Sequence, residues 1–153
     1  MRRTNKRVGL CLVLIGLNLA LIWGNSLISG ETSGEMSGTV MEFILKLLHL
    51  PASAAEPLHH LIRKAAHFSE FACLAMELTW LCGMLGEKKA HLAVLPVAGG
   101  MFAALVDESI QMQTPGRGPS LTDVWIDTSG AVMGMMIVFL GYHLLQRKRR
   151  NEQ

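Results

Sequence analysis

Four apolar stretches, each about twenty residues long, are the feature that most constrains how this chain can fold. A helix needs about 20 apolar residues to cross the hydrocarbon core of a bilayer. The sequence predicts such helices at about 8–28, 65–85, 92–110 and 124–145. Only 17% of the residues are charged, fewer than the roughly 25% typical of soluble domains. We therefore expect an all-α fold, a polytopic membrane bundle of four transmembrane helices, with residues 1–153 forming a single domain.

The distribution of Lys and Arg predicts how this bundle lies in the cell membrane. With the N-terminus inside, four basic residues fall outside: Lys46, Arg63, Lys64 and Arg117. Ten fall inside: Arg2, Arg3, Lys6, Arg7, Lys88, Lys89, Arg147, Lys148, Arg149 and Arg150. Loops rich in Lys and Arg stay in the cytoplasm, so we expect a multi-pass protein with both termini cytoplasmic. The net charge of only +2 gives no reason to expect a nucleic-acid partner.

The longest loop, residues 29–63, is predicted to lie outside. Its first part, 29–39, is rich in Gly, Ser, Thr and Glu and is expected to be flexible. Apolar residues then recur at helical spacing over 40–50, which predicts an amphipathic helix lying on the outer leaflet. Pro51 should end this helix, because proline interrupts a helix interior.

Ionisable residues form a stripe along the second predicted span. At 100° per residue, Arg63, His67, Glu70 and Glu77 share one face, and Lys64 lies at its edge. Each charged residue at the centre of a lipid-facing helix costs about 2.5–3.5 kcal/mol even on the mildest scale. The stripe is therefore expected to face the bundle interior or an aqueous cavity. His59 and His60, just before it, are interpreted as solvated.

The third span carries polar groups at its outer end. Asp107 and Gln111 are one helical turn apart, on the face that carries Gly100, Ala103 and Ala104. Small residues let another helix approach closely, so these polar side chains should lie at a helix–helix contact. Glu108 lies beside them.

The fourth span has a face of carboxylates and glycines. Asp123, Asp127, Gly130, Gly134 and Gly141 fall within a narrow stripe. Gly130-xxx-Gly134 is a small-xxx-small pattern, and the three glycines are predicted to pack against a neighbouring helix. The two carboxylates lie at the outer end of this face.

The polar groups of three spans and one turn are predicted to share one depth. The turn that holds Arg117 contains two Pro and two Gly residues. We infer a single polar pocket that opens outward, with these candidates: Arg63, Lys64, His67, Glu70, Asp107, Glu108, Gln111, Arg117, Asp123 and Asp127.

The order of these motifs resembles the VanZ-like family. The shared pattern is a basic pair followed by His and Glu, then Asp-Glu-x-x-Gln, then an Arg-bearing turn, then Asp and a glycine-rich last helix. It covers residues 63–134, about half of the chain. Asp127 departs from the pattern, because many members have Asn there. The resemblance implies a role in resistance to glycopeptide antibiotics such as teicoplanin, and it implies no reaction.

The function expected is cell-envelope binding of the VanZ-like type, with an enzyme or a transporter as the alternatives. Arg63, Lys64 and Arg117 could hold the phosphate or carboxylate of a lipid or cell-wall headgroup, or a glycopeptide antibiotic. An intramembrane enzyme acting on a phospho-lipid or cell-wall precursor would use the carboxylates and His67 as acid and base, or to bind a divalent ion. A proton-coupled transporter would use Glu70 and Glu77 as a relay. The spacing of the residues identifies no metal or cofactor.

The cysteines point to no further chemistry. Cys11, Cys73 and Cys82 all lie in apolar stretches without the spacing of a disulfide framework or a zinc site, so we interpret them as buried small hydrophobic residues.

The predicted orientation can be tested with a reporter that is active only outside the cytoplasm, fused after the C-terminus. The ten-to-four division of basic residues predicts low activity. High activity in cells that contain full-length fusion protein would contradict this orientation and place the polar pocket on the cytoplasmic side.

Overall fold

The chain is entirely helical in the part that the structure describes. A computed structural model describes residues 2–151, so both ends of the predicted 1–153 domain lie just outside the described residues. The elements in chain order are α1 (Arg2–Leu27), α2 (Gly30–Leu48), the short 3-10 helix η1 (Ala52–Ala54), α3 (Ala55–Met84), α4 (Lys89–Gln111) and α5 (Leu121–Asn151). Within residues 2–151 there is no strand, as the sequence predicts.

Three of the helices are long and apolar enough to cross a membrane. Their spans are Asn5–Leu27, His91–Gln111 and Leu121–Leu145, and they match three of the four predicted stretches. Several spans are typical of a multi-pass membrane protein. The fourth predicted span, 65–85 in α3, is not among them, because its His and Glu residues lower its mean hydropathy. That α3 also crosses the membrane stays a prediction.

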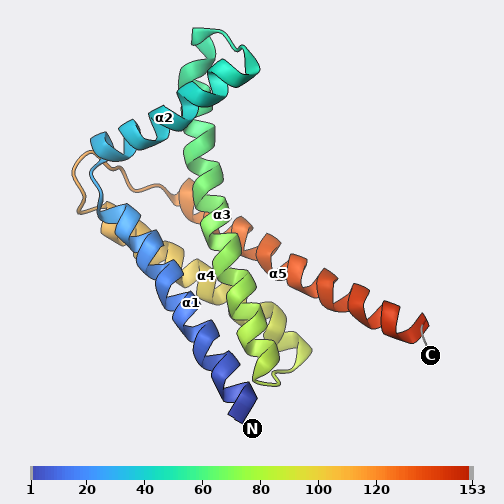
Figure 1. Ribbon diagram of the computed structural model, residues 1–153. Coiled ribbons are helices and arrows are strands. Elements are labelled where there is room, and N and C mark those ends of the chain that lie inside the picture. Colours follow the sequence, from blue (N-terminus) through green and yellow to red (C-terminus); the bar gives the residue numbers. More distant parts are fainter. Residues whose placement is uncertain (1, 152–153) are drawn as a thin grey trace.

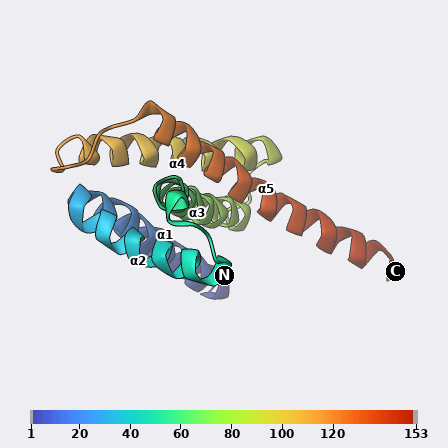
Figure 2. The ribbon, with the colours of Figure 1, turned by 90° about the horizontal axis from the view of Figure 1, so that it is seen from above.

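The central position of α3 accounts for its polar composition. It packs against α1, α2, α4 and α5, and Figure 2 shows it between α1 on one side and α4 and α5 on the other. Phe71, Leu74 and Ala75 form its buried apolar side. A helix surrounded by other helices can carry ionisable groups that a lipid-facing helix cannot.

The segment after α1 is helical from its beginning, where the sequence predicted a flexible loop over 29–39. Ser29 caps α2, because its hydroxyl oxygen accepts a hydrogen bond from the Thr32 N–H at 3.3 Å. A contact with α3 also stabilises α2, because the Nε2 of His59 in α3 lies 2.7 Å from the Ser37 Oγ. The interpretation of His59 as solvated is therefore wrong. This docking onto α3 is a long-range contact, which the local Gly and Ser content cannot reveal.

The amphipathic helix lies over the end of α1 and packs against α3 (Figure 2). Figure 1 shows α2 lying across the end of α1 rather than alongside it, at the end where α5 begins. It ends at Leu48, with His49 in the left-handed conformation at its C-cap and Pro51 two residues further on. The predicted termination before Pro51 is confirmed, and the helix begins ten residues earlier than predicted, at Gly30 instead of Val40.

Two glycines bring the backbones of α3 and α5 together. A Cβ atom at Gly130 would overlap the carbonyl oxygen of Phe68, and one at Gly134 would overlap the carbonyl oxygen of Ala72. A Cβ at Gly100 would lie 2.6 Å from that of Ala131, so α4 also approaches α5 closely. These contacts confirm the predicted close packing at Gly130 and Gly134.

Gly141 is not a packing glycine, contrary to the prediction. A Cβ there would meet nothing within 4 Å. Figures 1 and 2 show why: the C-terminal half of α5 diverges from the other helices. The stripe repeats along the helix, but two helices that cross at an angle stay in contact over only a few turns.

This difference gives a matched pair of variants. We expect Gly134→Val to lower the amount of folded protein in membranes and its melting temperature, because the added side chain must displace the α3 backbone. Overpacking of this kind costs about 1–3 kcal/mol or more. Gly141→Val makes the same chemical change in open space and should behave like the wild type. Equal melting temperatures for both variants would show that the crossing is not tightly packed.

Candidate functional site

At one end of the bundle α1 and α4 end and α5 begins (Figure 1). The candidate polar residues lie in these parts of the chain and in the first half of α3. His67 lies midway along α3, Asp107 lies one turn before the end of α4, and Asp127 lies in the second turn of α5. One imidazole and two carboxylates thus come from three different helices to one point.

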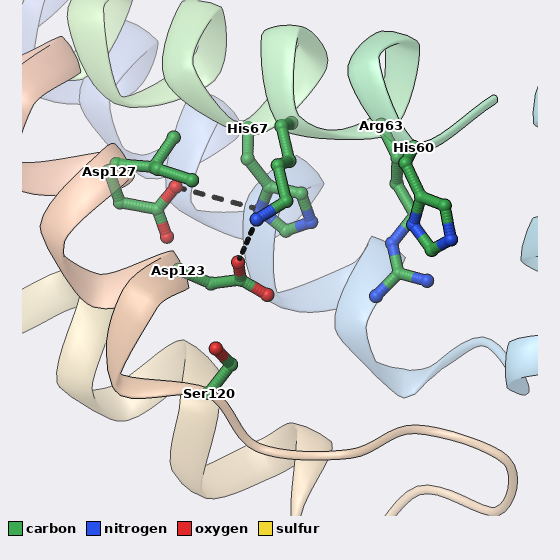
Figure 3. A pocket seen from close by; sticks show the side chains of 8 residues that line it. His60, Arg63, His67, Ser120, Asp123 and Asp127 are labelled. Atoms are coloured by element: carbon green, nitrogen blue, oxygen red, sulfur yellow. Dashed lines mark hydrogen bonds and ion pairs between the residues drawn. The ribbon is translucent and has the colours of Figure 1, made fainter. Parts of the chain in front are cut away.

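These three side chains form a compact cluster. One ligand-type atom of each residue lies within 4.8 Å of those of the other two. The His67 Nδ1 is 3.9 Å from the Asp127 Oδ1, a contact drawn in Figure 3. Asp107 and Asp127 are 0% exposed, and the His67 side chain is 17% exposed. Two buried carboxylates therefore face one partly buried imidazole.

Asp107 is held firmly by hydrogen bonds to both of its oxygens. The Ser26 hydroxyl of α1 donates to Oδ1 at 2.6 Å, and the Gln111 amide donates to Oδ2 at 2.7 Å. The Gln111 Nε2 also lies 3.2 Å from the Ser26 Oγ. Buried polar groups normally find such partners, so the position of this carboxylate is fixed.

Asp127 is buried without a hydrogen-bond partner. Neither of its oxygens accepts a hydrogen bond from any described residue, and the same holds for the His67 Nδ1. An unsatisfied buried polar group costs about 1–3 kcal/mol, and a charged group costs more. In contrast to Asp107, Asp127 has only the His67 imidazole, 3.9 Å away, as a polar neighbour in an ion-pair contact.

A small cavity opens onto this pair between α3 and α5. It has a volume of about 190 Å³ and is lined by His60, Arg63, Lys64, His67, Ser120, Asp123, Ile126 and Asp127. Figure 3 shows the basic side chains of α3 on one side and the carboxylates of α5 on the other. His60, which was interpreted as solvated, is exposed, and its side chain also lines this cavity.

A second cavity lies on the other side of Arg63 and His67. Its volume is about 260 Å³, and Glu70, Asn25 and Arg117 contribute to its wall together with apolar residues of α2. The Asn25 amide donates to the Glu70 Oε1 at 3.0 Å. Arg63 and His67 line both cavities, so they form the wall that the two share.

The two neighbouring cations of α3 differ in how they are paired. The Lys64 Nζ lies 3.4 Å from the Asp123 Oδ1, and both side chains are partly exposed. Arg63 is half-buried and has no hydrogen bond or ion pair to any described residue. A guanidinium with five N–H donors is thus directed into the polar region without an acceptor.

Glu108 connects the start of α5 to α4. Its Oε2 accepts a hydrogen bond from the Ser120 backbone N–H at 2.7 Å, while its Oε1 is buried without a partner among the described residues. A carboxylate at a helix start is favourable, because the first N–H groups have no partner within the helix. Glu108 therefore has a structural role besides its place near the cluster.

Arg117 is used mainly to hold the end of α1. Its Nη2 donates to the Asn25 carbonyl at 2.9 Å, and its Nε donates to the Ile28 carbonyl at 3.3 Å. Thr114 donates from Oγ1 to the Ser26 carbonyl at 2.9 Å. These carbonyls lie at the end of α1 and just beyond it, where a helix has few N–H groups to offer them. Burial and the nearby Arg63 charge lower the pKa of Arg117, yet an arginine keeps its proton in proteins.

The turn that places Arg117 matches its sequence. The Arg117 N–H donates to the Thr114 carbonyl at 3.2 Å, and Gly116 has φ +73°. Pro115 followed by a glycine with positive φ is the signature of a type II turn. The predicted tight turn is confirmed, and the Gly30 N–H donates to the Pro115 carbonyl at 3.0 Å, so the turn also anchors α2.

Sequence reasoning missed the contribution of α1. Asn18, Asn25 and Ser26 donate hydrogen bonds to Glu77, Glu70 and Asp107, respectively. Seven residues separate Cys11, Asn18 and Asn25, so they share one face of α1 that turns toward α3. Asn18 and Asn25, seven residues apart in an apolar span, could have revealed that α1 contributes to the polar region. A polar group in a membrane helix normally faces other helices.

The fold and this cluster define a multi-pass, all-helical membrane protein with a His–carboxylate site between its helices. The chain belongs to the VanZ/LLP1 family, whose defining pattern matches residues 11–142. The resemblance read from the motifs is thereby confirmed over nearly the whole chain. No curated protein and no solved structure matches the sequence.

The bonds of Arg117 predict a structural effect of its removal. Arg117→Gln should lower the melting temperature of the purified protein, because the carbonyls of Asn25 and Ile28 lose a charged donor. Such a loss amounts to about 1–3 kcal/mol. Arg147→Gln, which removes an exposed arginine near the other end of α5, is the control. An unchanged melting temperature for Arg117→Gln would show that these bonds do not stabilise the fold.

Proposed function

We propose that this protein acts in the cell envelope by binding an anionic headgroup, that of a lipid or cell-wall precursor, in an outward-facing polar pocket. The VanZ-like resemblance adds a role in resistance to glycopeptide antibiotics of the teicoplanin type. The single observation that carries the proposal is Arg63, a half-buried arginine between two cavities with no partner among the described residues.

The chemistry of Arg63 suits a phosphate or carboxylate. Its planar guanidinium donates two parallel hydrogen bonds to such an anion, and these are about twice as strong as neutral ones. His60 and Lys64 line the same cavity and add donors. Lys64 already pairs with Asp123 at 3.4 Å, with both groups exposed to solvent, so an incoming anion can compete for it at little cost.

The size of the pocket favours a headgroup over the antibiotic itself. The two cavities measure about 190 and 260 Å³, below the roughly 300–1,000 Å³ of sites that enclose drug-sized ligands. A glycopeptide antibiotic is larger still. In this proposal resistance arises from what the protein does to an envelope component, and the antibiotic does not occupy the pocket.

The predicted topology supports the same ligand. If α3 crosses the membrane beside α1, α4 and α5, the polar end of the bundle lies at the outer interface, where lipid headgroups are. The amphipathic α2 lies across the end of α1 at this end of the bundle (Figure 1), and its apolar side chains, such as Phe43 and Leu47, are exposed. A helix of this kind lies in the headgroup region.

A second candidate, an intramembrane enzyme acting on the same headgroup, is favoured by the His67–Asp127 pair. An imidazole 3.9 Å from a buried carboxylate, both lining the pocket, is an arrangement that can act as acid and base.

The third candidate, a proton relay from Glu70 to Glu77, gains no such support. The two carboxylates line different cavities, and Asn18 donates to Glu77. A transporter would need a connection between them.

Binding of a polyprenyl phosphate to the purified protein tests the proposal. Arg63→Gln should weaken binding about 10-fold or more, because hydrogen bonds to charged groups contribute about 1.5–3 kcal/mol. Arg63→Lys should fall in between, since lysine keeps the charge and loses the two-pronged geometry. Arg147→Gln, with its arginine far from the pocket, should bind like the wild type.

The link to resistance is tested in cells. A strain that lacks the gene should become sensitive to teicoplanin, and the wild type should restore resistance where Arg63→Gln at normal abundance does not. If Arg63→Gln binds the polyprenyl phosphate as tightly as the wild type, headgroup recognition by this pocket is wrong. If it restores full resistance, the link between the pocket and resistance is wrong.

A further inference from the structure

We propose that His67, Asp107 and Asp127 bind a divalent transition-metal ion of the Zn²⁺ or Mn²⁺ type at the base of the polar pocket. The inference does not rest on headgroup binding, because its evidence is the geometry and the unmet hydrogen bonding of these three side chains. Arg63 and Lys64 account for binding of an anion in the pocket, and the metal ion would account for the neighbouring cluster of one imidazole and two carboxylates.

The three donors have the spacing of a ligand set. One atom of each residue lies within 4.8 Å of those of the other two, and the His67 Nδ1 and the Asp127 Oδ1 are 3.9 Å apart. Ligands bound at 2.0–2.2 Å to a tetrahedral ion are about 3.4 Å apart. Small rotations of side chains that come from three helices close this difference.

The absence of any other partner for Asp127 points to a cation. Its side chain is 0% exposed, and neither oxygen is hydrogen-bonded to a described residue. The Nδ1 of His67 is also buried without a partner and is directed at this carboxylate (Figure 3). Buried charges in proteins are paired or coordinate metals. The nearest lysine, Lys64, is engaged one turn away with Asp123.

Asp107, the third donor, is oriented by hydrogen bonds from neighbouring side chains, as metal ligands usually are. Ser26 and Gln111 each donate to one oxygen of Asp107, which fixes the orientation of the carboxylate. A carboxylate oxygen has two lone pairs, so each can accept a hydrogen bond and still bind an ion. Outer partners of this kind orient the ligands of metal sites and raise their affinity.

The donor types select the class of ion. Ca²⁺ and Mg²⁺ prefer sites made of oxygen, whereas an imidazole favours Zn²⁺ and other transition metals. Three protein ligands leave at least one coordination position, as in catalytic zinc sites. His67 and Asp127 both line the 190 Å³ cavity, so that position faces the space into which Arg63 is directed.

The competing explanation is a proton in place of the metal. A neutral Asp127 could remain buried without an ion, and the substitution Asp127→Asn imitates that neutral form in size and shape. The two explanations therefore predict opposite behaviour of one variant, which makes them separable.

The test uses full-length protein without a histidine tag, stripped with a chelator and titrated with Zn²⁺ or Mn²⁺. Elemental analysis after removal of free metal should give about one ion per chain for the wild type. Asp127→Asn and His67→Gln should each lower the affinity by roughly tenfold or more, since even changes in outer partners lower metal affinity about 10–100-fold. Glu77→Gln removes a carboxylate of α3 in a different cavity and should leave binding unchanged.

Thermal unfolding supplies a readout that does not depend on activity. Metal should raise the melting temperature of the wild type, because a ligand that binds only the folded state stabilises it. It should not do so for Asp127→Asn. A wild type that takes up no ion, or an Asp127→Asn variant that binds metal as the wild type does, overturns the proposal. A third outcome also overturns it: the melting temperature of the wild type does not change with metal, and Asp127→Asn melts at a higher temperature than the metal-free wild type.

The metal and the headgroup are tested apart. Arg63→Gln should retain the ion and lose the polyprenyl phosphate. If the wild type binds the phosphate but no ion, the metal proposal fails alone. If it binds the ion but no phosphate, the proposed function fails alone.

Discussion

The close approach of α5 to α3 is the contact on which the rest of the site depends. Gly130 and Gly134 lie directly against the carbonyl oxygens of Phe68 and Ala72, with no space for a Cβ atom. Asp127 is one helical turn before Gly130, and His67 directly precedes Phe68. The glycines therefore bring the Asp127 carboxylate to within 3.9 Å of the imidazole. Larger residues at the crossing would separate the two helices and the two side chains together.

The surrounding helices make this polar crossing tolerable. Ser26 from α1 and Gln111 from α4 satisfy Asp107, and Asn25 satisfies an oxygen of Glu70. In a membrane such groups must find partners within the protein, because hydrocarbon offers none. α3 can carry its ionisable stripe since it packs against each of the other four α-helices. Asp127 is the carboxylate of the cluster with no hydrogen bond to a described residue, in contrast to Asp107.

Much of the fold followed from local patterns, and the failures have physical causes. The apolar stretches predicted three membrane spans and the helical character of a fourth segment. The start of α2 was missed because its stability comes from docking by His59 and from the Ser29 cap. Gly141 was assigned to a contact that the crossing angle of α5 does not reach. The Ser29 cap is a local signal, whereas the His59 contact joins residues 22 positions apart and the Gly141 contact depends on the angle between two helices.

The sequence by itself determined which polar residues share a helical face and which end of the bundle they occupy. These properties follow from the helical repeat of 100° per residue and from the length of an apolar span. Only the tertiary structure decided the pairing. Arg117 binds the end of α1, and Lys64 pairs with Asp123. Arg63 has no hydrogen bond or ion pair to a described residue, and Asp127 has no hydrogen bond to one. Side-chain pairing is set by the distance and angle at which helices cross. Those depend on small residues in three helices acting together, which no single stretch of sequence encodes.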